Sequence, residues 1–284
     1  MPTTSPSSTA AARTGRARVL PFDPSRDGFS FSNRFLWTDD DLAHLAARLR
    51  PWTAGLTAAI PTLVGGSVRG VRGGVSGTVV GAALAAAHVD GRVVAALARR
   101  WPQFGLCGGM AHVAIERWPL RAGLPTAHLE KVRVRPLLRR RQEQTIRDAA
   151  FTYARYWLPM RTGLAPMPHP PFGTALLRQY VAVRVRLDSG RPALLHLVGD
   201  ARDPFANHQV VAFGYRDHAD RAGGVLLVYD PNAPGVTRHV SVGVLAADPG
   251  RCDITTDIPT GPRASRDAIS RTRGRIGMVF TTAV

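Results

Sequence analysis

Lysine is almost absent from this basic chain. Among the 37 lysine and arginine residues only Lys131 is a lysine, and the formal net charge is +17. A phosphate-binding P-loop needs a lysine after a glycine-rich turn, and Lys131 does not follow one, so this motif is excluded. So many arginines in a chain rich in alanine, glycine and proline indicate GC-rich coding, which makes part of the charge compositional. Because arginine suits phosphate geometry, a basic nucleic-acid-binding protein is kept as an alternative.

Cysteine and long apolar runs are also scarce. The two cysteines, Cys107 and Cys252, cannot form a disulfide framework, which predicts a reducing, cytoplasmic location. A membrane span needs about 20 strongly apolar residues, and the glycine-rich stretch 60–90 is too weakly apolar, so we predict no membrane partner and assign that stretch as an insertion. The chain has no HExxH motif and no paired CxxC motifs, so we assign no metal and no cofactor.

The order of the elements predicts the α+β class. Residues 1–20 are rich in Ser, Thr, Ala, Pro and Arg without an apolar run of signal-peptide length, and we expect a disordered tail. Residues 21–284 are predicted to form one domain, with a helical lobe over about 21–160 and a β lobe over about 172–284. The expected helices are 39–50 after the Thr38 cap, 92–100 and 135–157, the last as one or two helices, and residues 159–171, with five prolines, are expected to be a loop. The expected strands are Tyr180–Leu187, Ala193–Gly199, His208–Tyr215, Val225–Asp230, Val236–Val242 and Ile276–Thr281.

A lone cysteine stands between glycines in the stretch F-G-L-C-G-G-M-A, residues 104–111. Apolar residues from Met110 onward recur at helical spacing, so Cys107 lies at the expected start of a helix. The unpaired N–H groups and the positive end of the helix dipole favour a thiolate there. Gly108 and Gly109 carry no Cβ, which we expect to let a substrate backbone approach the sulfur. Cys107 is therefore the candidate nucleophile.

His208 is the histidine best placed to act as its base. It begins a predicted strand directly after the polar loop that ends in Asn207, and the next strand ends in Asp230-Pro231-Asn232. If the loop between the strands turns near residue 219, His208 and Asp230 lie opposite each other and Asn232 is a diagonal neighbour on the same face. The carboxylate is then expected to hold Nδ1–H and to leave Nε2 facing the thiol. A slip of one residue would turn Asp230 to the other face of the sheet.

Each of these residues also has an ordinary structural interpretation. Free cysteines are often buried small hydrophobes, so Cys107 could be part of the core. His208 could cap its strand through a structural hydrogen bond. Asp230-Pro231-Asn232 is a common turn sequence and has no meaning by itself. The hypothesis therefore depends on the three residues occurring together, in this order and in these contexts.

The motifs F-G-L-C-G-G-M, N-H-Q-V-V-A-F-G-Y and V-Y-D-P-N-A-P resemble the papain-like cysteine peptidase superfamily. The similarity is closest to the bacteriocin-processing (double-glycine leader) peptidases and covers about residues 101–245. It implies a papain-like fold, with Cys107 as nucleophile, His208 as general base and Asp230 as its orienter. The family's oxyanion-hole glutamine maps onto Gln103, which is closer to the cysteine than usual. Asn33, in the aromatic stretch 27–35, is a more distant substitute.

The resemblance predicts a cysteine hydrolase that acts on a peptide or amide bond. We assign substrate contacts to the residues beside the proposed nucleophile, base and orienter, namely Gly108, Gly109, Asn207 and Asn232. The main alternative is a catalytically inactive papain-like binding module. A nucleic-acid-binding protein is the less favoured one.

Overall fold

The computed structural model describes residues 15–44, 47, 103–120, 128–162, 172–198, 207–245, 248–258 and 278–282. These residues belong to two units, one made of 15–33 with 106–282 and the other of 34–47 with 103–105. Four predictions lie wholly or mostly outside the described residues: the tail 1–20, of which 1–14 is not described, the insertion 60–90, the helix 92–100 and the proline-rich loop, of which 163–171 is not described.

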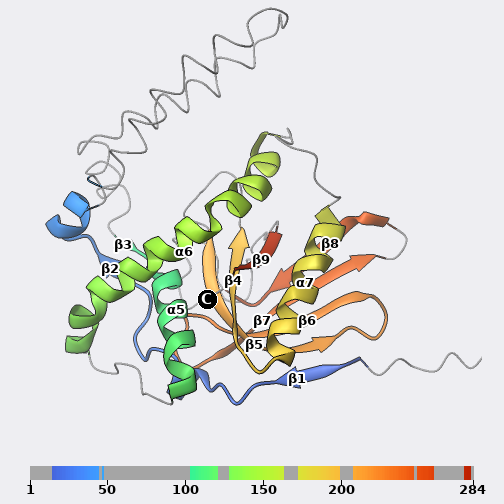
Figure 1. Ribbon diagram of the computed structural model, residues 1–284, viewed down its shortest axis with the longest axis horizontal. Coiled ribbons are helices and arrows are strands. Elements are labelled where there is room, and N and C mark those ends of the chain that lie inside the picture. Colours follow the sequence, from blue (N-terminus) through green and yellow to red (C-terminus); the bar gives the residue numbers. More distant parts are fainter. Residues whose placement is uncertain are drawn as a thin grey trace, which may run out of the picture. The chain divides into compact units, whose positions relative to one another are not determined.

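A mixed helix and strand fold forms the first unit, with an antiparallel half-barrel sheet. All strand pairs are antiparallel, in the order β8-β7-β6-β5-β4-β9, and β1 pairs with the second half of β5 (Figure 1). The strands are β1 (Ala17–Val19), β4 (Ala193–Val198), β5 (His208–Asp217), β6 (Ala222–Tyr229), β7 (Thr237–Leu245), β8 (Asp248–Thr256) and β9 (Met278–Thr282). Five of the six predicted strands are confirmed within a few residues at their ends.

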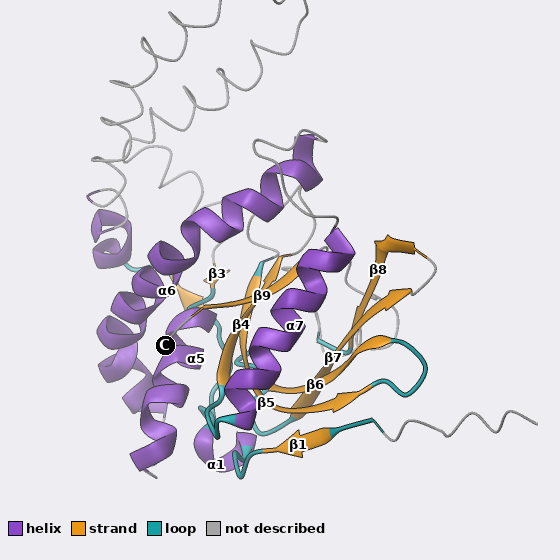
Figure 2. Cartoon of the chain, turned by 45° about the vertical axis from the view of Figure 1, so that its right-hand side comes forward, coloured by secondary structure: helices purple, strands orange, loops and turns teal. Residues whose placement is uncertain are grey.

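The central strands are buried on both faces. All six residues of β4 and the first eight of β5 are buried, whereas exposed or half-buried positions alternate with buried ones along β6. Helix α7 (Phe172–Asp188) lies across one face of the sheet, and α5 (Cys107–Arg117) packs against β5 and β4 (Figure 2). This double coverage explains why β4 and β5 have nearly continuous apolar sequences rather than an alternating pattern.

The predicted strand Tyr180–Leu187 is wrong, because this segment is the second half of α7. Its alternating valines imitate a strand, but Val181 and Val185 are exposed. The buried side chains recur at helical spacing: Leu176, Tyr180, Val183 and Leu187. The segment forms a helix and not a strand because only helical spacing places these four large side chains against the sheet.

Two helices of very different length carry the region of the cysteine. Helix α5 is followed by a 3₁₀ turn, η1 (Trp118–Leu120), and packs along α6 (His128–Thr162). The predicted helix 135–157 therefore forms, and it extends further in both directions as a single element. It continues past Pro159, so the predicted proline-rich loop begins later than expected.

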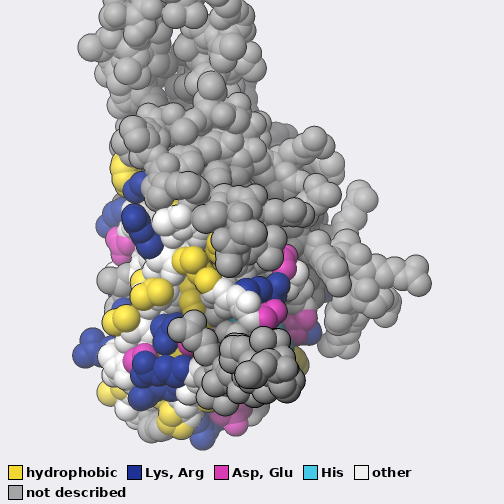
Figure 3. All heavy atoms as spheres, turned by 90° about the vertical axis from the view of Figure 1, so that its right-hand side faces the viewer, with side chains coloured by type: hydrophobic (Ala, Val, Ile, Leu, Met, Phe, Trp, Pro, Cys, Tyr) yellow, Lys and Arg dark blue, Asp and Glu magenta, His cyan; other side chains and the backbone are white. Residues whose placement is uncertain are grey.

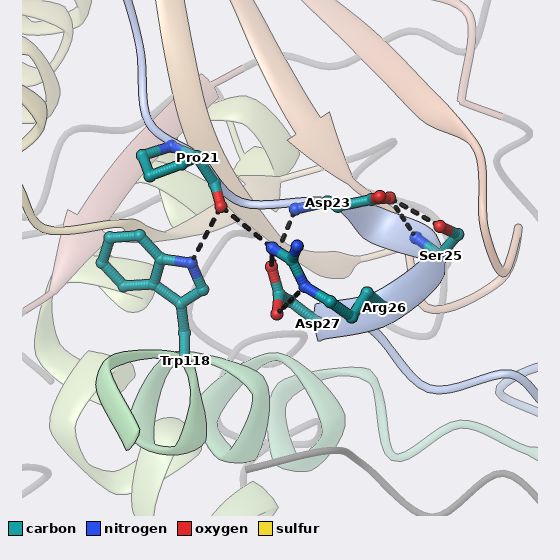
Figure 4. A network of polar contacts seen from close by, with 6 residues as sticks. All are labelled: Pro21, Asp23, Ser25, Arg26, Asp27 and Trp118. Carbon is teal, nitrogen blue, oxygen red and sulfur yellow. Dashed lines mark hydrogen bonds and ion pairs between the residues drawn. The ribbon is translucent and has the colours of Figure 1, made fainter. Parts of the chain in front are cut away.

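An amino-terminal arm, residues 15–33, crosses the first unit before the chain enters the second. Residues 17–19, predicted to be disordered, form β1 against β5, because the exposed edge of β5 beyond β4 offers backbone partners. Further along, α1 (Pro24–Asp27) is capped by Asp23, and the Pro21 carbonyl accepts from Arg26 at 3.1 Å and from Trp118 Nε1 at 3.5 Å (Figure 4). The arm is thus attached at several points before it reaches Asn33.

The second unit consists, among the described residues, of a short ladder and a helix start. Strand β2 (Phe35–Leu36) pairs with β3 (Gln103–Phe104), which sets Leu36 against Gln103. Thr38 caps a helix over 39–44, because its hydroxyl oxygen accepts from the Asp41 amide at 3.3 Å, and its own N–H and hydroxyl donate to Asp41 Oδ2, at 3.0 and 2.7 Å. The predicted Thr38 cap is confirmed, and the helix is described as far as residue 44.

Basic side chains are interspersed with other types on the face shown in Figure 3. Lysine and arginine side chains lie there in separate groups, with acidic and hydrophobic side chains between them. A nucleic-acid site would present a continuous basic field. This face therefore offers no such field among the described residues that it displays.

Candidate active site

Cys107 is the first residue of α5, as the sequence predicts. The side chain is buried, with 8% of its surface exposed. The preceding residue, Leu106, is the N-cap residue, and no side chain caps the helix there. The Gly109 amide donates to Gln142 Oε1 at 3.1 Å and the Met110 amide to the Leu106 carbonyl at 2.9 Å. The sulfur therefore lies at the positive end of the helix dipole, beside its own backbone amide.

Gly108 and Gly109 serve close packing rather than open space. A Cβ on Gly108 would overlap the Gln209 side-chain oxygen and the Thr145 hydroxyl. A Cβ on Gly109 would overlap the backbone of Leu138 in α6. The expectation that the missing Cβ atoms leave room for a substrate backbone is therefore not met on these sides of the glycines. Their absence instead lets α5 approach α6 and β5.

Gly109→Ala is expected to destabilise the protein more than Gly108→Ala. At Gly109 the new methyl meets the backbone of Leu138 within a helix, which cannot yield, so we expect a loss of about 1–3 kcal/mol or more. At Gly108 the nearest atom is the end of the flexible Gln209 side chain, which can move. Urea unfolding of both variants measures the difference. Equal losses would contradict the assigned packing.

A β-bulge decides which face Asp230 occupies. Near the hairpin Gly214 pairs with Leu227, but beyond Phe213 the register changes and Val211 pairs with Tyr229. Continued past the strand end, this second register places Asp230 opposite Val210, on the same face as His208. Without the bulge, Asp230 would be turned to the opposite face. The expected direct pairing of His208 with Asp230 is wrong by two residues, but the expected shared face is correct.

His208 and Asp230 form a short buried ion pair. Nε2 of His208 lies 2.6 Å from Asp230 Oδ1, and Asp230 is fully buried. The predicted use of the ring nitrogens is reversed, because Asp230 engages Nε2 and leaves Nδ1 as the other nitrogen available to the thiol. The reason is the diagonal placement of Asp230, which brings its carboxylate to the far end of the ring. The Asn232 amide N–H also donates to Asp230 Oδ1, at 2.8 Å, and Asn232 Nδ2 lies 3.3 Å from His208 Nε2.

The surroundings of His208 favour its charged form. Burial disfavours the imidazolium, but the negative charges of Asp230 and Cys107 and the hydrogen bonds with both side chains outweigh it and raise the pKa of His208 to about 10. Cys107 and Asp230 thus both stabilise the charged ring, and Asp230 does so through the 2.6 Å contact with Nε2. An imidazolium beside a thiol stabilises the thiolate. The arrangement is suited to nucleophilic attack by sulfur.

Asn33 lies at this site, although it is 74 residues before Cys107 in a different segment. Its Oδ1 accepts from the Leu106 amide, its Nδ2 donates to Asn232 Oδ1 at 3.2 Å, and its own amide donates to the Pro231 carbonyl at 2.9 Å. The suggested role of Asn33 as an oxyanion donor is thus joined by a structural one, since one of its Nδ2 hydrogens is already used. Gln103 belongs to the second unit, and its oxyanion role stays a prediction, as does the substrate contact assigned to Asn207.

Three residues near the nucleophile are not predicted from the sequence. Gln142 and Thr145 of α6 and Gln209 of β5 surround the first turn of α5. A signal did exist, since Leu138, Gln142 and Thr145 share one face of a helix by their spacing. Behind them, Gln209 Nε2 lies 3.1 Å from His196 Nδ1, and His196 Nε2 lies 3.0 Å from the Thr282 hydroxyl. Burial lowers the pKa of His196 to about 3, so this ring is neutral and structural.

Metal and membrane signals are missing from the described part of the chain. No group of three His, Cys, Asp or Glu residues there could hold a metal ion. None of the helices described combines the length and the apolar character that a membrane span requires. No protein-family model, curated protein or solved structure matches the chain.

Proposed function

We propose that the protein is a papain-like cysteine hydrolase that cleaves a peptide or amide bond by acyl transfer. The observation that carries the proposal is the imidazole of His208, which contacts the buried carboxylate of Asp230 at 2.6 Å and whose pKa is raised by both Asp230 and Cys107. Burying a charged pair costs desolvation energy, and this cost favours a functional role for the His208–Asp230 pair. The antiparallel sheet and the placement of the nucleophile on a helix and the base on a strand support the papain-like assignment.

The reaction follows from the positions of the protons. The Cys107 thiolate attacks the carbonyl carbon, so that a C–S bond forms and negative charge moves to the carbonyl oxygen. The amide N–H of Cys107 is one donor for that oxygen, at the positive end of α5. His208 then gives its proton to the leaving nitrogen as the C–N bond breaks. Water, losing a proton to His208, attacks the thioester and releases the acid and the thiolate.

An ester burst tests this proposal without knowledge of the natural substrate. With p-nitrophenyl acetate we expect one equivalent of nitrophenol per chain in a fast phase, a mass increase of one acetyl group on Cys107, and then slow turnover. Cys107→Ala should show neither phase. Cys252→Ser should retain both and serves as the matched control, because it removes the only other thiol.

Two results would count against a hydrolase. Stable acetylation without turnover, or turnover that survives Cys107→Ala, would each contradict the mechanism. The first result would favour a binding module with a reactive thiol. The second would place any esterase activity elsewhere in the chain.

A further inference from the structure

The amino-terminal arm reaches the candidate site through one side chain. Asn33 is the last residue of the first unit before the chain leaves it, and Leu106 is the first residue after its return. Both polar ends of the Asn33 side chain are used, one by the Leu106 amide and the other by Asn232 Oδ1. The residue is 7% exposed, so these hydrogen bonds are shielded from water.

Each partner of Asn33 is adjacent to one half of the catalytic pair. Leu106 precedes Cys107 directly and is the N-cap residue of α5, where no side chain of its own caps the helix. Asn232 donates its backbone N–H to Asp230 Oδ1, and its side-chain nitrogen lies 3.3 Å from His208 Nε2. The backbone amide of Asn33 adds a third bond, at 2.9 Å, to the Pro231 carbonyl between Asp230 and Asn232.

We propose that Asn33 is a positioning residue, which holds the start of the nucleophile helix at a set distance from the turn that orients His208. We call Leu106, Asn33 and Asn232, with their hydrogen bonds, the amide bridge. α5 is a separate element from the β5–β6 hairpin, so the sulfur and the ring are brought together only by packing and by such links. A misplacement of about 1 Å between reacting groups costs about 100-fold in rate. This inference rests on the proposed function, because it assigns a role within the same site.

The test compares alkylation of Cys107 by iodoacetamide at pH 6 and at pH 9, followed by mass spectrometry in the full chain. At pH 9 a cysteine thiol ionises without help, whereas at pH 6 it needs the neighbouring imidazolium. The rate ratio is the alkylation rate at pH 6 divided by the rate at pH 9. For the wild type we expect a rate ratio close to one. For Asn33→Ala we expect the ratio of the two rates to fall about 10-fold, with the pH 9 rate within about 3-fold of wild type.

A matched control weakens the same arm away from the site. In the wild type the Asp23 side chain caps α1 by accepting from the Ser25 amide at 2.8 Å, and Asp23→Ala removes this cap (Figure 4). We expect it to lower the melting temperature by a few degrees and to leave the rate ratio unchanged. A role of Asn33 in stability alone would make Asn33→Ala behave in the same way as this control.

A double-mutant cycle identifies the bridge itself. If Asn33 and Asn232 act through one link, the rate ratio of Asn33→Ala/Asn232→Ala should match that of the stronger single variant within about 2-fold. Independent effects would multiply instead and would overturn the amide bridge. If Asn33→Ala fails to fold, Asn33→Ser is used, because its hydroxyl can serve the Leu106 amide but is too short to span to Asn232 as well.

The outcomes separate the two proposals. A wild-type rate at pH 6 that is about 100-fold below that at pH 9, as for an isolated thiol, overturns the hydrolase and the positioning role together. A fast wild type with an unchanged ratio in Asn33→Ala or Asn33→Ser overturns the positioning role alone. A ratio that falls in these variants but not in Asp23→Ala supports it.

Discussion

His208→Ala is expected to lower ester turnover about 10²- to 10⁴-fold, the range that a general acid and base contributes. The ring interacts both with Cys107 and with the buried carboxylate of Asp230. Its removal leaves the thiol without a proton acceptor in acylation and the attacking water without one in deacylation. Stopped-flow release of nitrophenol measures the acylation step, and steady-state release measures the deacylation step. Both should slow, because the ring acts in each.

The chain offers a matched control for this substitution. His239 Nδ1 lies 3.1 Å from Asp257 Oδ2, and both side chains of this second histidine–aspartate pair are about half exposed. His239→Ala should therefore leave turnover unchanged. Alkylation gives an independent readout, since at pH 6 Cys107 should react faster than Cys252 in the wild type and lose this advantage in His208→Ala. Equal rates at both cysteines in the wild type would contradict the role of His208.

Asp230→Ala is expected to cost about 3–5 kcal/mol in the free energy of unfolding at pH 6. The substitution leaves a buried imidazolium without its carboxylate, because Asp230 is fully buried and lies 2.6 Å from Nε2. Asp230→Asn should cost less, since its amide oxygen can still accept the Nε2 proton. Asp257→Ala, which breaks the exposed pair with His239, should cost less than about 1 kcal/mol.

The cost of Asp230→Ala should depend on pH in a defined direction. The pKa of His208 is raised from about 6.5 to about 10 on folding. A raised pKa contributes stability that is complete below pH 6.5 and is lost as the pH rises towards 10. Because Asp230 is a principal cause of the shift, the difference between wild type and variant should be largest near pH 6 and shrink by pH 9.5. Urea unfolding at pH 6, 8 and 9.5 measures this, and a difference that grows with pH would contradict the buried ion pair.

Local patterns in the sequence were sufficient for most elements but failed where two patterns competed. The helix at Cys107 and the strand at His208 follow from spacing and flanking residues, and both begin at the expected position. The segment Tyr180–Leu187 fits both a strand and a helix when read alone. Only its contact with the sheet separates them, because Val181 and Val185 are exposed while Val183 is buried.

The stretch around Cys107 shows the same division within one motif. Its cysteine lies at a helix start for reasons that the neighbouring residues contain. The purpose of Gly108 and Gly109 is set by Gln209 and by the backbone of Leu138, which are distant in the sequence. The sequence shows that two glycines follow the cysteine, but only the packing shows which neighbouring residues leave no room for a side chain there.

From the sequence alone one obtains the α+β order of elements, the cysteine at a helix start and the strands that carry His208 and Asp230, because each depends on local periodicity or turn chemistry. Tertiary structure alone decided that the bulge at Phe213 turns Asp230 to the face of His208, and that Nε2 rather than Nδ1 meets the carboxylate. It alone brought Asn33 to Leu106 and Asn232. The physical reason is that register and close approach are set by packing between distant segments, where a change of one residue inverts a face.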